Sequence, residues 1–289
     1  MKTVADWAGR VTSYDYDAAG NLVKTTRPDG SVLSETYDNT NRLISMNDVD
    51  ANNNIIDGYA YTYDAEGKIL TETSSDGQTT STMTYDADGR LTSRQDKDSG
   101  GNVTASHTYI YDAAGNVTSS DGTGMTYDIQ DRLISYNGQS ITYDADGNMT
   151  GGLLNGAAAA FSYDSGNRLV QADDTAYAYD AEDNRIFSTT SGQTTTYAYD
   201  TEGSLSQLLV ATEPDGKNTY YVYGIGLVGA ESTDGSYSAY HYDYRGSTTA
   251  ITDGQGAVTD RYTYDAYGKL LSHTGTSNTP FLYDDRDGV

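Results

Sequence analysis

The sequence predicts an all-β fold, a long antiparallel meander of short hairpins coiled into a spiral or barrel-like sheet. Two observations predict it: a Tyr-Asp dipeptide recurs along the whole chain, and the same residue types follow each copy. Composition provides a third observation: the 289 residues include 28 Tyr but only 3 Phe and 1 Trp. With so few large apolar residues, tyrosine has to do much of the burying, and each buried hydroxyl then needs a hydrogen-bond partner.

Leaving aside an overlapping pair at Tyr14, the dipeptide occurs thirteen times, and the positions after it follow a rule. Position +4, counted from the tyrosine, is always Gly, Asn or Asp, the residues that tolerate a positive φ. Position +6 is aliphatic in eleven copies, with Arg185 and Thr248 as exceptions. The tyrosines are Tyr16, Tyr37, Tyr63, Tyr85, Tyr111, Tyr127, Tyr143, Tyr163, Tyr179, Tyr199, Tyr242, Tyr264 and Tyr283.

A three-residue hairpin loop, a type I turn followed by a left-handed residue, explains both offsets. In "YDAEGKIL" the loop is 65–67, so that Asp64 lies opposite Lys68 and Tyr63 lies opposite Ile69. The aspartate before the loop can accept hydrogen bonds from its own turn. The residues predicted to form such turns and to share one face are Tyr63, Asp64, Gly67, Ile69, Tyr111, Asp112, Gly115 and Val117.

Each repeat needs a second turn, predicted as three-residue loops at 75–77, 120–122 and 136–138. In the shortest repeat, loop 120–122 would pair Val117 with Met125. Even spacings keep every tyrosine on one face, because a slip of one residue would flip it. The odd step of 21 residues, from Tyr16 to Tyr37, therefore predicts a β-bulge.

Position −2 also belongs to the tyrosine face and is aromatic or aliphatic, apart from Glu35. The opposite face is rich in Thr, Ser, Asp and Gln. A flat sheet with an aromatic face would expose that face to water, so the sheet is expected to coil and cover itself.

Charge and cysteine content exclude several classes of protein. A net charge of −25 predicts that the chain binds no nucleic acid and repels anionic lipid. No apolar run approaches about 18 residues, so that no membrane insertion is expected. Without Cys there is no disulfide, thiolate chemistry or cysteine zinc site. This composition is typical of a secreted or cell-surface bacterial protein, whose export signal would lie outside this sequence.

Segments such as "YDAAGNLV", "YDADGRLT" and "YDAYGKLL" resemble the tyrosine-aspartate (YD) repeats of bacterial RHS proteins and teneurins. Residues 240–271 resemble the start of the RHS-associated core. The resemblance implies a YD-repeat shell, with a β-hairpin array over 1–223 and the start of the core over 224–289. It also implies an internal fragment of a longer protein. The aspartyl self-cleavage motif of many relatives has no match here.

One acidic stretch is a candidate calcium site. Asp48, Asp50, Asn52 and Asn54 stand at positions 1, 3, 5 and 7 of a loop, as in the opening of a calcium-binding loop. The glycine expected at position 6 is Asn53, and the closing glutamate is replaced by Tyr59. The alternative is an ordinary Asn- and Asp-rich turn; no other cofactor is predicted.

The pattern predicts a structural role and not an enzyme, because catalysis needs one site and not thirteen. The first hypothesis is a scaffold, part of a shell that encloses or presents another polypeptide, as in toxin delivery or intercellular competition. Its partners would be a polypeptide cargo or neighbouring repeats of the full-length protein. The alternative is a cell-surface adhesin or fibre segment that binds glycans or associates end to end through strand edges.

Overall fold

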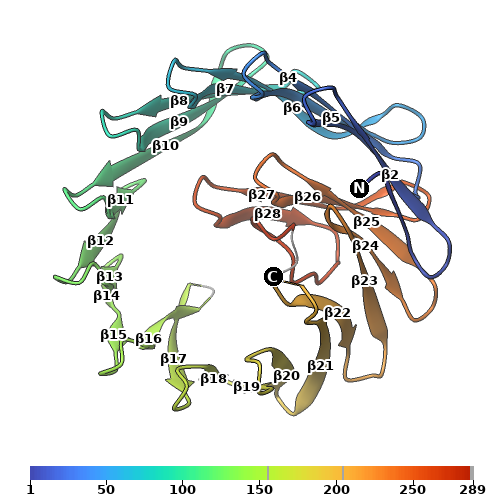
Figure 1. Cartoon of the computed structure of the whole chain (residues 1–289). Coiled ribbons are helices and arrows are strands. Elements are labelled where there is room, and N and C mark those ends of the chain that lie inside the picture. The colour runs from blue at the N-terminus through green and yellow to red at the C-terminus, as the bar shows by residue number, and fades with distance from the viewer. Residues whose placement is uncertain (155, 204, 287–289) are drawn as a thin grey trace. The chain divides into compact units, whose positions relative to one another are not determined.

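The computed structural model describes residues 1–154, 156–203 and 205–286, and over these residues it is built from strands and turns without a helix. The strands form two 14-stranded sheets in which spatial order follows chain order (Figure 1). This confirms the predicted all-β meander of short hairpins. The described residues contain no helix long and apolar enough to cross a membrane.

The first sheet consists of β1 (Thr3–Ala5), β2 (Val11–Tyr16), β3 (Leu22–Thr26), β4 (Val32–Tyr37), β5 (Leu43–Val49), β6 (Ile55–Tyr63), β7 (Ile69–Ser74), β8 (Thr79–Tyr85), β9 (Leu91–Asp98), β10 (Val103–Tyr111), β11 (Val117–Ser120), β12 (Thr123–Tyr127), β13 (Leu133–Tyr136) and β14 (Gln139–Ser140). The second consists of β15 (Thr142–Tyr143), β16 (Met149–Leu154), β17 (Ala157–Tyr163), β18 (Leu169–Ala172), β19 (Thr175–Tyr179), β20 (Arg185–Thr190), β21 (Gln193–Asp200), β22 (Gln207–Thr212), β23 (Asn218–Gly224), β24 (Gly226–Ser232), β25 (Tyr237–Tyr242), β26 (Thr248–Asp253), β27 (Val258–Tyr264) and β28 (Leu270–Thr274).

The chain divides into two compact units. Unit 1 contains residues 1–80 and 198–289, and unit 2 contains residues 81–197. Neither limit falls at the predicted boundary between 223 and 224, where β23 and β24 pair in one antiparallel ladder. The sheet is therefore continuous at this point.

In unit 1, strands from the two ends of the chain pack against each other. The ring of Tyr61 on β6 contacts that of Tyr244, which follows β25, with centroids 5.2 Å apart. Trp7, before β2, lies edge-on to Tyr220 on β23 at 5.7 Å. Unit 1 is therefore a two-layered structure that buries the face between its layers.

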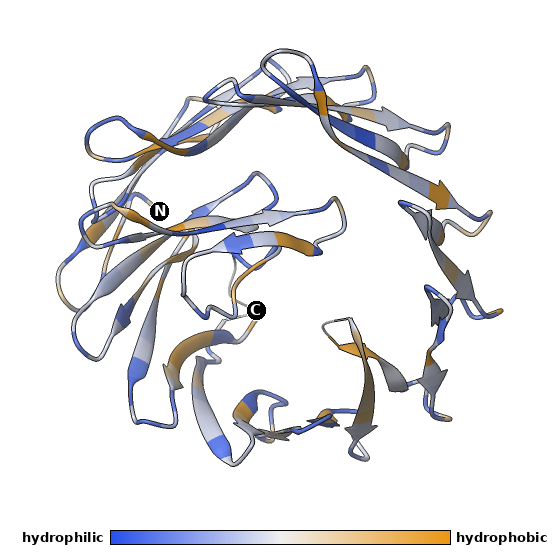
Figure 2. Cartoon of the chain, turned by 180° about the vertical axis from the view of Figure 1, so that it is seen from behind, coloured by the Kyte–Doolittle hydropathy of each residue, from blue (hydrophilic) through white to orange (hydrophobic). Residues whose placement is uncertain are grey.

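Tyrosine supplies much of the core of unit 1. Six tyrosines are at most 6 % exposed, namely Tyr14, Tyr61, Tyr221, Tyr237, Tyr240 and Tyr262. Leu227, Ala239 and Ala250 are fully buried beside them. Hydrophilic residues gather in the turns, whereas the strands are mostly pale because tyrosine is only weakly hydrophilic on this scale (Figure 2).

Unit 2 consists of successive hairpins, each paired with its neighbours in the chain. The ladder is interrupted at Ile141, between β14 and β15, and this side chain is buried.

Two of the three predicted second turns are shorter than expected. Ser120 pairs with Thr123 and Tyr136 pairs with Gln139, so the loops are Asp121-Gly122 and Asn137-Gly138. All four loop residues have positive φ, as in a type I′ turn, whose twist suits two adjacent strands. The predicted three-residue loops at 120–122 and 136–138 are therefore wrong.

At 75–77 the left-handed glycine lies where it was predicted, but the loop between β7 and β8 has four residues and not three. Gly77 has φ 68° and its N–H donates to the carbonyl of Ser74 at 2.8 Å. Gln78 adds a fourth residue before β8 begins.

A β-bulge that the sequence did not reveal lies beside the repeat turn. Tyr63 pairs with Ile69, but Thr62 pairs with Thr71, so that Leu70 is the extra residue. The same shift follows the tyrosine in ten hairpins. As a result Val117 does not pair with Met125, since Ser119 pairs with Gly124.

Candidate functional site

The repeat turn is held by its aspartate. At residues 64–68 the Gly67 N–H donates to the Asp64 carbonyl, and the Asp64 N–H donates to the Lys68 carbonyl. The Lys68 N–H also donates to Asp64 Oδ1 at 2.8 Å. Gly67 has φ 88°, and Tyr63 lies opposite Ile69.

The second predicted turn has the same geometry. Asp112 Oδ1 accepts from the N–H groups of Ala114 and Asn116, both at 2.9 Å. Gly115 has φ 99°, and Tyr111 lies opposite Val117. Hydrogen bonds from Asn116, from its side chain above all, lower the pKa of Asp112, so the turn uses the ionised carboxylate.

Position +4 adopts the left-handed conformation in eleven of the thirteen copies, including Asn41, Asp131, Asn167 and Asp183. Gly203 does not, and Leu205 after it is 60 % exposed. The last copy, Asp287, lies outside the described residues.

Tyrosine hydroxyls connect one repeat to the next. The hydroxyl of Tyr143 donates to the carbonyl of Leu133, at position +6 of the preceding copy, at 2.8 Å. The bulge beside position +6 interrupts the regular ladder at this carbonyl. The same bond joins Tyr63 to Leu43, Tyr111 to Leu91, Tyr127 to Val117, Tyr179 to Leu169 and Tyr264 to Thr248. Here the buried hydroxyls find the partners that the composition requires.

Arginines at position +5 reinforce the same junction. Arg132 pairs with Asp128 of its own turn at 2.7 Å and lies 4.8 Å over the ring of Tyr143 in the next repeat. The other examples place Arg42 over Tyr63, Arg90 over Tyr111 and Arg168 over Tyr179. A cation over an aromatic ring adds stabilisation of about 0.5–1 kcal/mol at a partly exposed site.

The four candidate calcium ligands do not form one site. Asp50 closes another turn of the repeat type, accepting from the N–H groups of Asn52 and Asn54 at 2.8 Å and from the Asn54 amide. Asn53 occupies the left-handed position with φ 63°. Asp48 is 2 % exposed and paired with Arg27 and His241. These contacts fit the alternative of an Asn- and Asp-rich turn, and the described residues contain no cluster of three His, Cys, Asp or Glu suited to a metal ion.

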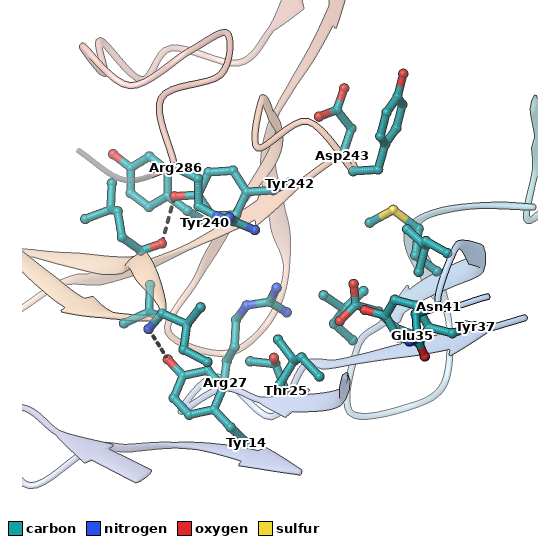
Figure 3. A pocket seen from close by; sticks show the side chains of 18 residues that line it. Tyr14, Thr25, Arg27, Glu35, Tyr37, Asn41, Tyr240, Tyr242, Asp243 and Arg286 are labelled. Atoms are coloured by element: carbon teal, nitrogen blue, oxygen red, sulfur yellow. Dashed lines mark hydrogen bonds between the residues drawn. The ribbon is translucent and has the colours of Figure 1, made fainter. Parts of the chain in front are cut away.

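A cavity of about 340 Å³ lies between the two layers of unit 1 (Figure 3). Tyrosines and aliphatic side chains form most of its wall, including Tyr14, Leu33, Met46, Leu227 and Tyr242. Four charged residues line it as well: Arg27, Glu35, Asp243 and Arg286.

Glu35 is the least expected residue in this wall. Burial raises its pKa to about 6, against the opposing effects of Arg286 and Arg27. Its Oε2 is buried and has no hydrogen-bond partner among the described residues. The sequence carried one signal for this, since Glu35 is the polar exception at position −2.

The segment after β28 closes one side of the cavity. Phe281 is 5 % exposed and packs edge-on against Tyr221 with centroids 5.0 Å apart. The Arg286 carbonyl accepts from Leu227, and the Arg286 N–H donates to Gly246 at 3.0 Å. Nothing in the repeat pattern predicts this inward course of residues 275–286.

Comparisons with known proteins agree with this architecture. Residues 68–200 match the family model described as Teneurin YD-shell, and residues 2–32 match the model described as RHS Repeat. No curated protein matches the sequence.

Two solved structures have a similar fold. One is a crystal structure of TcdB2-TccC3, with a TM-score of 0.62 and 16 % identity over 95 % of this chain. The other is a Tc holotoxin pore from Photorhabdus luminescens, with a TM-score of 0.60 and 15 % identity over 95 % of this chain. This chain spans 18 % of the length of each of those chains.

Proposed function

This chain is a YD-repeat protein of the RHS class, and on that premise we propose that it is a non-enzymatic scaffold. It forms a segment of a shell that encloses or presents another polypeptide. In this proposal residues 1–223 are the repeat array, and residues 224–289 begin the RHS-associated core.

One observation carries the proposal: the tyrosine face of unit 1 points inward. Tyr14, Tyr61 and Tyr240 are 3–4 % exposed, whereas the hydroxyl pairs Thr36–Ser45 and Thr62–Thr71 lie on the exposed face. A surface that binds glycans would need its aromatic rings in solvent. Inward rings favour enclosure over adhesion.

The mechanism is steric. Hairpins joined by tyrosine hydroxyls and arginines form a rigid wall. This wall prevents proteases and other proteins outside from reaching the enclosed polypeptide. The similarity to toxin complexes supports delivery of a toxic polypeptide in competition between cells. The corresponding location is secreted or at the cell surface.

The course of the chain after β28 suggests the test. A disordered reporter with one protease site is fused after Val289, and the same reporter is fused before Met1 as the matched control. Because Phe281 and Arg286 pack against the cavity side of unit 1, the C-terminal reporter is expected to be cleaved more than tenfold more slowly. Equal cleavage rates would contradict enclosure.

A further inference from the structure

A buried polar cluster in unit 1 is not accounted for by the repeat pattern. His241 on β25 and Thr252 on β26 are fully buried, and Asp48 on β5 is 2 % exposed. Arg27 and Asp29, in the connection between β3 and β4, are 5 % and 6 % exposed. The cluster therefore links the N-terminal repeats to the core-like segment.

His241 has an oxygen on each side of its ring. Its Nδ1 lies 2.8 Å from Asp48 Oδ2, and its Nε2 lies 2.9 Å from Thr252 Oγ1. The Thr252 hydroxyl donates to Asp29 Oδ2 at 2.6 Å. Arg27 completes the cluster with Nη1 2.9 Å from Asp48 Oδ2.

The hydrogen-bond partners determine the protonation state of the His241 ring. A hydroxyl has one hydrogen, and Thr252 gives it to Asp29, so towards Nε2 it can only accept. Asp48, as a carboxylate, also only accepts. Both ring nitrogens must then carry a hydrogen, which makes the ring a cation. We propose that His241 is a buried imidazolium that acts as a proton-dependent clasp between the two layers of unit 1.

Charge balance leads to the same state. With His241 cationic, Arg27 and His241 balance Asp48 and Asp29; with a neutral ring the cluster would hold one uncompensated buried negative charge, which is costly. Although burial opposes ionisation, the charges of Arg27 and His241 lower the pKa of Asp48.

Two other titratable groups face the cluster. Asp57 on β6 is the cross-strand partner of Asp48, and burial raises its pKa, which favours its neutral form. Burial raises the pKa of Tyr237 to well above its usual range, so its phenol stays neutral beside Asp29 and Arg27. Neither group supplies the missing positive charge.

Loss of the proton would break the clasp. A bare Nε2 would face the lone pairs of Thr252, and a bare Nδ1 would face the Asp48 carboxylate, so either tautomer places two acceptors in contact. Unit 1 should therefore become less stable as pH rises and the proton leaves.

Nuclear magnetic resonance of the ¹⁵N-histidine-labelled chain tests the protonation directly. His241 is expected to show two protonated ring nitrogens at pH 7, where exposed histidines are mostly neutral. The variants His107→Asn and His273→Asn assign the three signals. A neutral His241 ring, with hydrogen only on Nδ1, would overturn the proposal.

Thermal unfolding between pH 6 and pH 9 tests the clasp itself. Trp7 is the only tryptophan and contacts Tyr220 across the layers, so its fluorescence reports on their separation. The wild type should lose several degrees of Tm over this range, whereas His241→Gln should start lower and lose little. His273→Asn is the matched control, because His273 is partly exposed and pairs with Asp260 at one ring nitrogen.

Thr252 provides a second pair of variants if His241→Gln does not fold. Thr252→Ser keeps the acceptor and should behave like the wild type, whereas Thr252→Val removes it and should lower Tm most near pH 6, where the ring is protonated, and flatten the dependence of Tm on pH. A Tm of the wild type that is independent of pH in this range would contradict the clasp.

Discussion

At the scale of single residues, the tyrosine of the repeat does more than fill the core. Its ring packs on the inner face, its hydroxyl closes a bond to the preceding repeat, and an arginine of that repeat covers the ring. A phenylalanine ring could also pack and lie under an arginine, but it could not form the hydroxyl bond, which accounts physically for 28 Tyr beside 3 Phe.

Replacement of one tyrosine isolates the hydroxyl. Tyr143→Phe should destabilise unit 2 by about 1 kcal/mol, because the Leu133 carbonyl loses its donor while the ring stays in place. Urea unfolding followed by circular dichroism measures the change. Tyr136→Phe is the control, since within the described residues the Tyr136 hydroxyl has no hydrogen-bond partner. An equal loss of unfolding free energy in both variants would show that the hydrogen bond from Tyr143 to Leu133 does not stabilise unit 2.

Glu35, in contrast to the repeat tyrosines, lowers the stability of the folded protein. Its pKa of about 6 in the folded protein exceeds the ordinary value of 4.5. Folding therefore favours the protonated carboxyl, and stability falls as pH rises from 4.5 towards 6. Glu35→Gln should stabilise unit 1 by about 2 kcal/mol at pH 7 and by almost nothing below pH 4.5.

Paired unfolding curves at pH 4 and pH 7 measure this difference. The exposed Glu66 in the turn after β6 supplies the control, because Glu66→Gln should change stability little at either pH. A stabilisation by Glu35→Gln that is the same at both pH values would mean that ionisation is not its cause.

At the scale of the element, position +4 decides where the hairpin turns. The rule that only Gly, Asn or Asp stands there follows from a backbone that goes left-handed, so this part of the fold could be read from the sequence. The bulge at position +7 could not, because Leu70 and its equivalents are ordinary strand residues.

Two features that were not predicted from the sequence, the bulge and the two-residue turn, offset each other in the spacing of the repeats. The bulge shifts the side-chain alternation by one residue, and the two-residue turn at Asp121-Gly122 shifts it back, so that a spacing of 16 keeps the tyrosines on one face. Between Tyr16 and Tyr37 a three-residue turn, 28–30, takes the place of the two-residue turn, and the spacing becomes odd. A bulge is present there, as expected, but it is shared by other repeats and does not by itself explain the step of 21.

Glycine at position +4 can be tested with a close match elsewhere in unit 2. Gly147 has φ 91° and Gly124 has an ordinary φ, and a Cβ would meet no atom within 4 Å at either. Gly147→Ala should cost about 1–2 kcal/mol from backbone strain alone. Gly124→Ala should be neutral or stabilising, since it restricts only the unfolded chain. Comparable urea midpoints for the two variants would argue against a left-handed turn at Gly147.

At the scale of the whole molecule, the repeat pattern predicted the strands and their order but not the two-layered packing of unit 1. Every repeat carries nearly the same turn, so the pattern is silent about which repeats face each other. The contacts between the layers come from residues outside the pattern, such as Arg27, Asp48, His241 and Phe281. The same absence of periodicity hid the cavity and the inward course of residues 275–286.

This difference in packing predicts uneven local stability. In a repeat array, stability is close to a sum of neighbour contacts, and local opening is correspondingly easy where no second layer is present. Strands β24 to β26 hold the fully buried Leu227, Ala239, Ala250 and His241, whereas β11 to β15 have no side chain below 9 % exposure. Amide hydrogen exchange should therefore be slowest in β24 to β26 and at least tenfold faster in β11 to β15, although all are hydrogen-bonded strands. If protection were the same in both regions, backbone pairing and not the buried layer would set stability, and the role assigned to the tyrosine-lined interior of unit 1 would have to be abandoned.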